Sequence, residues 1–158
     1  MYNQIYPNEK SFVIVGSGPL LQKLKDFSKR YDNVFPLGYV ENELLKDLYA
    51  SAICFLFPTK MEAFPFSLLE ALSSGLPIIT SPVGGIPDLF KQKLDIGIMI
   101  RNWNDYRNIV NNIHDLIDNS KNLKQIQKNC RQLAERKYSW DIIGNEILKE
   151  YYKCLDSK

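Results

Sequence analysis

The chain has 158 residues, of which 45% are apolar and 24% charged, proportions typical of a globular domain with a sizeable core. Its 20 Lys and Arg residues nearly balance 18 Asp and Glu residues, which argues against nucleic acid or another polyanion as a partner. Three cysteines, an odd number without metal-ligand spacing, favour a reducing, cytoplasmic compartment, and the sequence has no apolar run of the roughly 20 residues that a spanning helix needs.

Short apolar runs alternate with helical segments over the first two thirds of the chain. The runs predict five strands, at Ser11–Val15, Asn33–Leu37, Ile53–Phe57, Ile78–Thr80 and Ile98–Ile100. The first is β-branched and aromatic throughout, which is typical of a strand covered on both faces. Strands connected through helices form right-handed βαβ units and a parallel sheet. We therefore predict an α/β fold: one Rossmann-like, three-layer domain over residues 1–158 with about five parallel strands.

The last third, from Asn102 onward, is predicted to be helical. Its apolar residues recur at helical spacing in three stripes, the first of which includes Trp103, and Ser139 is placed to cap the last helix. Such stripes usually form core. The only histidine, His114, falls in the first of these helices and is expected to be structural or on the surface.

The loops at the carboxyl ends of the strands form the edge where open parallel sheets bind ligands. Four polar or glycine-rich segments fall there: Gly16–Pro19, Gly38–Val40, Pro58–Phe66 and Ser81–Gly85. Topology alone therefore predicts that these segments meet. For Gly16 and Gly18 two explanations stay open, because glycines at this turn either cradle a phosphate or serve a tight strand-to-helix turn, and the second is the commoner.

The segment Pro58–Leu89 carries two acids, Glu62 and Glu70, across a loop-to-helix junction. Pro65 suits the first helical position, because its fixed φ is helical and its missing N–H costs nothing there. The next three residues would then present N–H groups without a partner in the helix, and such groups attract an anion such as a diphosphate. These residues are Phe66, Ser67 and Leu68.

A Glu, seven residues and a second Glu, in a loop that opens a helix ending in Gly-x-Pro, resembles the donor-site motif of retaining glycosyltransferases of the GT-B fold, particularly glycosyltransferase family 4 (glycosyl transferases group 1). The resemblance covers roughly residues 10–155. Further segments match in the family's order: Phe12–Pro19, Asn33–Val40, Leu48–Pro58, Gly84–Asp88 and Tyr138–Trp140.

The resemblance implies roles for particular residues. Glu62 would be catalytic, contacting the donor sugar near the reacting carbon, and Glu70 would bind the ribose hydroxyls. The backbone between them would line the sugar and diphosphate, and the second glycine-containing loop would border the base. No metal or other cofactor is expected besides the nucleoside-diphosphate sugar, which is the substrate. The donor-binding residues implied are Gly16, Gly18, Gly38, Tyr39, Val40, Phe64, Pro65, Phe66, Ser67, Leu68 and Glu70.

The implied activity is retaining transfer of a glycosyl group to a saccharide or lipid-linked acceptor in polysaccharide or glycoconjugate biosynthesis. In the family an acceptor-binding N-terminal domain precedes this half, together with an Arg and a Lys that grip the diphosphate. We therefore expect this chain to be inactive alone and to work with such a domain in cis or as a separate chain, through which peripheral membrane association would occur. The final helix, with Trp140, Ile143, Ile147, Tyr151 and Tyr152, would then expose an apolar face or self-associate.

Two alternatives stay open. A nucleotide-sugar epimerase of GT-B architecture would use acids and histidines of both domains, for which His114 is poorly placed. A non-catalytic, Rossmann-like regulatory module would keep the strand and helix pattern but would not need Glu62 and Glu70 in this order. Binding of uridine or guanosine diphosphate, compared with flavin and dinucleotides, would separate these alternatives.

Overall fold

A computed structural model describes residues 10–101, 104–118 and 120–156, so the predicted stripe residue Trp103 lies outside the described residues. The chain divides into two compact units, Met1–Leu48 and Tyr49–Lys158, which are described separately below.

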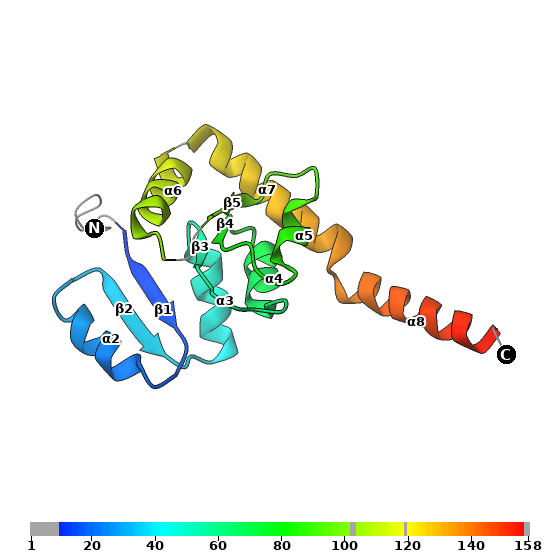
Figure 1. The fold of residues 1–158 in the computed structure, drawn as a ribbon, viewed down its shortest axis with the longest axis horizontal. Helices are drawn as coiled ribbons and strands as arrows, with labels where there is room; N and C mark the ends of the chain where they lie inside the picture. Colours follow the sequence, from blue (N-terminus) through cyan, green and yellow to red (C-terminus); the bar gives the residue numbers. More distant parts are fainter. Residues whose placement is uncertain (1–9, 102–103, 119, 157–158) are drawn as a thin grey trace. The chain divides into compact units, whose positions relative to one another are not determined.

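The first unit is a parallel pair of strands with a helix beside it (Figure 1). Phe12 aligns with Val34, and the register shifts between Ile14 and Val15. Most of the first strand's side chains are exposed, so the prediction of a strand covered on both faces is wrong. The physical reason is that two strands and the helices of this unit are too few to cover both faces. The elements are β1 (Phe12–Val15), α2 (Leu21–Ser28) and β2 (Val34–Gly38), and α3 (Asn42–Ser51) begins in this unit and ends in the second.

The second unit contains a three-stranded parallel sheet in the order β3-β4-β5. Phe55 aligns with Ile78, and Ile78 aligns with Gly97. Helices connect the strands, and three longer helices follow them. The elements are β3 (Phe55–Phe57), α4 (Phe66–Ser73), β4 (Ile78–Thr80), α5 (Ile86–Phe90), β5 (Gly97–Met99), α6 (Tyr106–Asp118), α7 (Ser120–Lys137) and α8 (Trp140–Asp156).

All five predicted strands are present within two residues of their expected limits and all pair in parallel, which confirms the α/β class. The sheet is smaller than predicted, because the ladders of the described chain run β1–β2 and β3–β4–β5, so its larger sheet has three strands. The helical last third is confirmed. The Ser139 cap is confirmed as well, since its Oγ accepts a hydrogen bond from the Ile142 N–H at 3.4 Å.

The core of the second unit forms around β4, whose three residues are all buried. Helix α4 inserts its apolar face into this core and packs against α7. The Arg131 guanidinium of α7 donates a hydrogen bond to the Ser73 carbonyl, which fixes the end of α4. The fully buried core side chains include Leu68, Ala71, Leu72, Ile78, Ile79, Ile86, Leu89, Ile96, Ile100 and Cys130.

Helix α8 has no buried residue and extends beyond the end of α7 (Figure 1). Trp140 is 80% exposed, and Ile147, Tyr151 and Tyr152 are more than half exposed, while Ile143 is half-buried. The predicted exposure of this apolar face is thus confirmed. None of the helices in the described ranges combines the length and the hydrophobicity that a bilayer span requires.

Candidate functional site

The candidate site lies in the second unit, where β3 and β4 end at the same edge of their parallel sheet. The chain leaves β3 through the loop that carries Glu62 and then enters α4, whose second turn carries Glu70. After β4 it makes a turn through Gly84 and Gly85. The Gly85 N–H donates to the Ala63 carbonyl at 2.7 Å, so the loop and the turn are in direct contact. The predicted meeting of these two segments is confirmed.

The start of α4 differs from the prediction by one residue. Pro65 is buried, has φ −78° and ψ 126°, and is therefore the extended residue that precedes the helix rather than its first helical residue. Its carbonyl accepts from the Leu68 N–H at 3.2 Å, so the prediction of three free N–H groups is wrong for Leu68. In the described part of the chain, the N–H groups of Phe66 and Ser67 have no acceptor, and they give this end its partial positive charge.

Glu62 is half-buried, and its carboxylate bends back toward its own loop. One oxygen, Oε1, accepts a hydrogen bond from the Ala63 N–H at 3.0 Å. This bond orients the carboxylate with a backbone donor, so the side chain depends on the path of the loop. The path is set in turn by the contact with the glycine turn.

Gly84 and Gly85 are needed because the Glu62 loop approaches them too closely for a side chain. A Cβ at Gly84, which has φ +55°, would lie 2.0 Å from the Glu62 carbonyl oxygen and 2.5 Å from the Ala63 carbonyl oxygen. A Cβ at Gly85 would lie 2.7 Å from the Phe64 ring. Sequence analysis placed this turn at the ligand edge but missed its role in positioning Glu62; the adjacent glycines after a strand were the available signal.

Phe64, a predicted donor-site residue, links this loop to the last helices. Its ring lies against Tyr138, with the ring centroids 6.1 Å apart, and against Gly85. Burial, and secondarily the charge of Asp88, raise the pKa of Tyr138. The Glu62 loop is therefore packed between the glycine turn and Tyr138, the residue that follows α7.

Glu70 is exposed and is held by a different kind of contact. The Tyr49 hydroxyl donates to Glu70 Oε2 at 3.1 Å and lies 3.4 Å from the Ser67 carbonyl oxygen. The Tyr49 ring packs edge-on against Phe55 of β3, with centroids 5.8 Å apart. The sequence gives no sign of this role for Tyr49, because nothing in its spacing shows a partner 21 residues away.

The electrostatics of this pair keep the phenol protonated. Burial, and then the nearby negative charge of Glu70 and its hydrogen bond, raise the pKa of Tyr49 well above its usual range. A phenol that keeps its proton remains a donor to the carboxylate at every physiological pH. Glu70 thus has one oxygen engaged by Tyr49.

The remaining predicted donor residues belong to the first unit. Gly16 and Gly38 end β1 and β2, and the Gly16 N–H donates to the Gly38 carbonyl at 2.8 Å, so these two loops meet as predicted within their unit. Both have positive φ, 131° and 76°, which explains the glycines as turn residues. Gly18 accepts from the Leu21 N–H at the start of α2, Tyr39 is exposed, and Val40 is half-buried.

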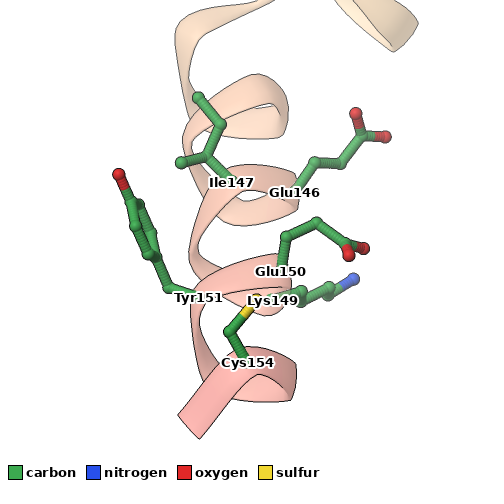
Figure 2. Close-up of a pocket in the computed structure, with 6 residues that line it drawn as sticks. All are labelled: Glu146, Ile147, Lys149, Glu150, Tyr151 and Cys154. Carbon is green, nitrogen blue, oxygen red and sulfur yellow. The ribbon is translucent and has the colours of Figure 1, made fainter.

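The acidic and histidine side chains outside this junction and the hollow on α8 do not form a competing site in the described ranges. Within the described residues, no group of three or more His, Cys, Asp or Glu side chains could hold a metal ion. His114 pairs with Asp118 one turn along α6, at 2.8 Å. A hollow on α8 is lined by one helix alone and is therefore open to solvent on its other side (Figure 2). Its lining residues are Glu146, Ile147, Lys149, Glu150, Tyr151 and Cys154.

The fold and this loop-to-helix junction define a class of protein. The family model for glycosyl transferases group 1 matches residues 7–154, which is nearly the whole chain. The chain belongs to this family, and it corresponds to the C-terminal domain of a GT-B glycosyltransferase.

Relatives and solved structures support this assignment. The chain is 35% identical to an Escherichia coli UDP-Gal:alpha-D-GlcNAc-diphosphoundecaprenol alpha-1,3-galactosyltransferase over 98% of its length and 38% of the relative's. It is 30% identical to the Arabidopsis thaliana sulfoquinovosyl transferase SQD2 over 92% of its length and 28% of the relative's. A crystal structure of Anabaena HepE in complex with UDP superposes with a TM-score of 0.80 at 17% identity, covering 96% of this chain and 43% of that one. The chain therefore spans between 28% and 43% of the length of these proteins.

Proposed function

We propose that this chain binds a nucleoside-diphosphate sugar and supplies the donor half of a retaining glycosyltransferase. The observation that carries the proposal is the junction between β3 and α4, where two free helix N–H groups lie between two acids that the fold holds by separate contacts. Family membership supports sugar transfer, and the UDP bound to HepE supports a nucleotide at a site of this fold.

In this proposal the chemistry is divided among the residues of the junction. The Phe66 and Ser67 N–H groups and the positive end of α4 stabilise the charge that develops on the leaving diphosphate. Glu70 accepts hydrogen bonds from the ribose hydroxyls. Glu62 contacts the donor sugar beside its reacting carbon, and this contact strengthens as positive charge develops there. Because the helix end takes the diphosphate charge, the reaction that we propose needs no metal ion.

We propose that the acceptor is a saccharide or a lipid-linked saccharide and that it binds to another domain, in cis or on a separate chain. The support is that this chain spans only 28–38% of its transferase relatives, one of which is named for a diphosphoundecaprenol-linked substrate. The biological role that follows is polysaccharide or glycoconjugate biosynthesis.

Titration calorimetry tests the roles of the two acids. The ligands are UDP, GDP, ADP and CDP, followed by sugar conjugates of the nucleotide that binds most tightly. Glu70→Gln should weaken binding of the bare nucleotide about tenfold, because a hydrogen bond to a charged group contributes roughly 1.5–3 kcal/mol. Glu62→Gln should leave the bare nucleotide almost unaffected but remove the additional affinity of the sugar conjugate.

Glu146→Gln is the matched control, because it removes the same charge from the exposed face of α8 and should change neither affinity. If no nucleotide binds the unmodified chain, the proposed function is wrong. If Glu62→Gln abolishes nucleotide binding while Glu70→Gln has no effect, the two roles are reversed. Negligible effects of both substitutions would show that these acids are surface residues.

A further inference from the structure

We infer that Tyr49 is a positioning residue of the donor site, which holds the Glu70 carboxylate so that it selects nucleotides with intact ribose hydroxyls. The inference rests on the proposed function, since it concerns the ligand that Glu70 binds. Its basis is the contact between the end of α3 and the second turn of α4, two elements that the loop after β3 separates in sequence.

The Tyr49 hydroxyl restrains the Glu70 side chain before a nucleotide binds. An exposed glutamate has three rotatable bonds, and fixing them on binding costs rotamer entropy. The Tyr49 hydroxyl, 3.1 Å from Glu70 Oε2, restricts these rotations before a ligand arrives. The carboxylate is then pre-organised, and pre-organisation increases affinity by reducing the cost of ordering.

One oxygen of the Glu70 carboxylate remains for the ligand. Tyr49 engages Oε2, and within the described part of the chain Oε1 has no hydrogen-bond partner. A carboxylate oxygen is an acceptor only, so it recognises hydroxyl donors such as those of ribose. This oxygen gains no hydrogen bond from a nucleotide that lacks the ribose hydroxyls.

Tyr49 itself is held in place by contacts of its ring and of its hydroxyl. Its ring packs edge-on against Phe55, whose ring stacks on Phe57 at a centroid distance of 5.8 Å. Both phenylalanines belong to β3, the strand that leads into the Glu62 loop. The hydroxyl also lies 3.4 Å from the Ser67 carbonyl oxygen, on the first turn of α4. The tyrosine therefore joins the donor helix to a rigid strand.

The experiment compares binding of a ribonucleoside diphosphate with binding of its 2′,3′-dideoxy analogue to the 158-residue chain, using the base that binds most tightly among UDP, GDP, ADP and CDP. Tyr49→Phe keeps the ring and removes only the hydroxyl. We expect the ribonucleotide to bind roughly three- to tenfold more weakly to this variant, from lost pre-organisation, while the affinity for the dideoxy analogue stays unchanged.

A double-mutant cycle shows whether Tyr49 acts through Glu70. After Glu70→Ala, the further change Tyr49→Phe should have no effect on either nucleotide, because residues that act as a unit are not additive. Tyr106→Phe, on the exposed side of α6, is the control for loss of a phenol and should not change binding.

Equal weakening of both nucleotides by Tyr49→Phe would show a merely structural role and overturn the inference, as would no weakening of either. These results differ from failure of the proposed function. In that case no nucleotide binds the unmodified chain, or Glu70→Ala leaves the discrimination between the two nucleotides intact.

Discussion

The two acids of the donor site are held in opposite ways. Glu62 lies in a loop whose backbone touches the Gly84–Gly85 turn, and its carboxylate is oriented by the N–H of its own neighbour. Glu70 lies on a helix anchored in the core, and its carboxylate is oriented by the hydroxyl of Tyr49. A backbone contact fixes where the first acid is, whereas a side-chain contact fixes where the second one points. Substitutions should therefore affect the two acids separately.

The largest effect is expected where the helix that carries Glu70 enters the core. Leu72→Ala removes a fully buried side chain and should lower the free energy of unfolding by about 2–5 kcal/mol. The measurement is denaturant unfolding, and Leu148→Ala on the exposed side of α8 is the control, with a loss below about 1 kcal/mol. If Leu72→Ala lowered the free energy of unfolding as little as the control does, α4 would not be anchored in the core. The account of how Glu70 is held would then be wrong.

The second-largest effect tests the backbone contact that places Glu62, independently of the helix that carries Glu70. Gly84→Ala should cost about 2–3 kcal/mol of stability, from a positive φ and from the clash with the Glu62 carbonyl oxygen. It should also remove the additional affinity of the sugar conjugate while binding of the bare nucleotide remains, because Glu70 does not touch this turn. Thermal unfolding and calorimetry measure the two consequences.

Gly75→Ala is the matched control for this backbone substitution. Gly75 also has a positive φ, +74°, but its Cβ would meet only the Gln127 carbonyl oxygen, at 3.4 Å, and Arg131 Cβ, at 4.0 Å. It should therefore cost about 1–2 kcal/mol and leave both ligand affinities unchanged. If Gly75→Ala impaired sugar-conjugate binding as much as Gly84→Ala, the turn would have no special role in placing Glu62.

The smallest effect is a pH dependence on the Glu70 side. Burial and the Glu70 charge raise the pKa of Tyr49 above its ordinary value of 10.0. The unfolded phenol loses its proton first, so this contribution to stability is present below about pH 10 and is lost as the pH rises toward the folded pKa. Between about pH 9 and 11, the melting temperature of the unmodified chain should fall more steeply than that of Tyr49→Phe. If the melting temperatures of the unmodified chain and of Tyr49→Phe fell in parallel over this pH range, Tyr49 would not be the cause of the pH dependence. Tyr106→Phe is the reference for the loss of an exposed phenol.

Local sequence determined the elements of this protein and the order in which they occur. Apolar runs such as Ile78–Thr80 placed the strands, the helical spacing placed α6 to α8, and the Ser139 hydroxyl marked a helix start, because these signals depend on neighbouring residues. The alternation of strands and helices also brought the Glu62 loop and the Gly84–Gly85 turn to one edge, since parallel strands end together.

Only the tertiary structure decided which residues hold the acids. Tyr49 reaches Glu70 across 21 positions, a contact without a recognisable spacing in the chain. The adjacent glycines after β4 indicate a turn, but they do not show that Gly84 meets the Glu62 carbonyl. The exact helix start at Pro65 was decided in the same way. Its φ suits a first helical residue, but ψ is free to vary, and the ψ of 126° places this residue before the helix. Proline restricts one backbone angle, and the packing of the loop sets the other.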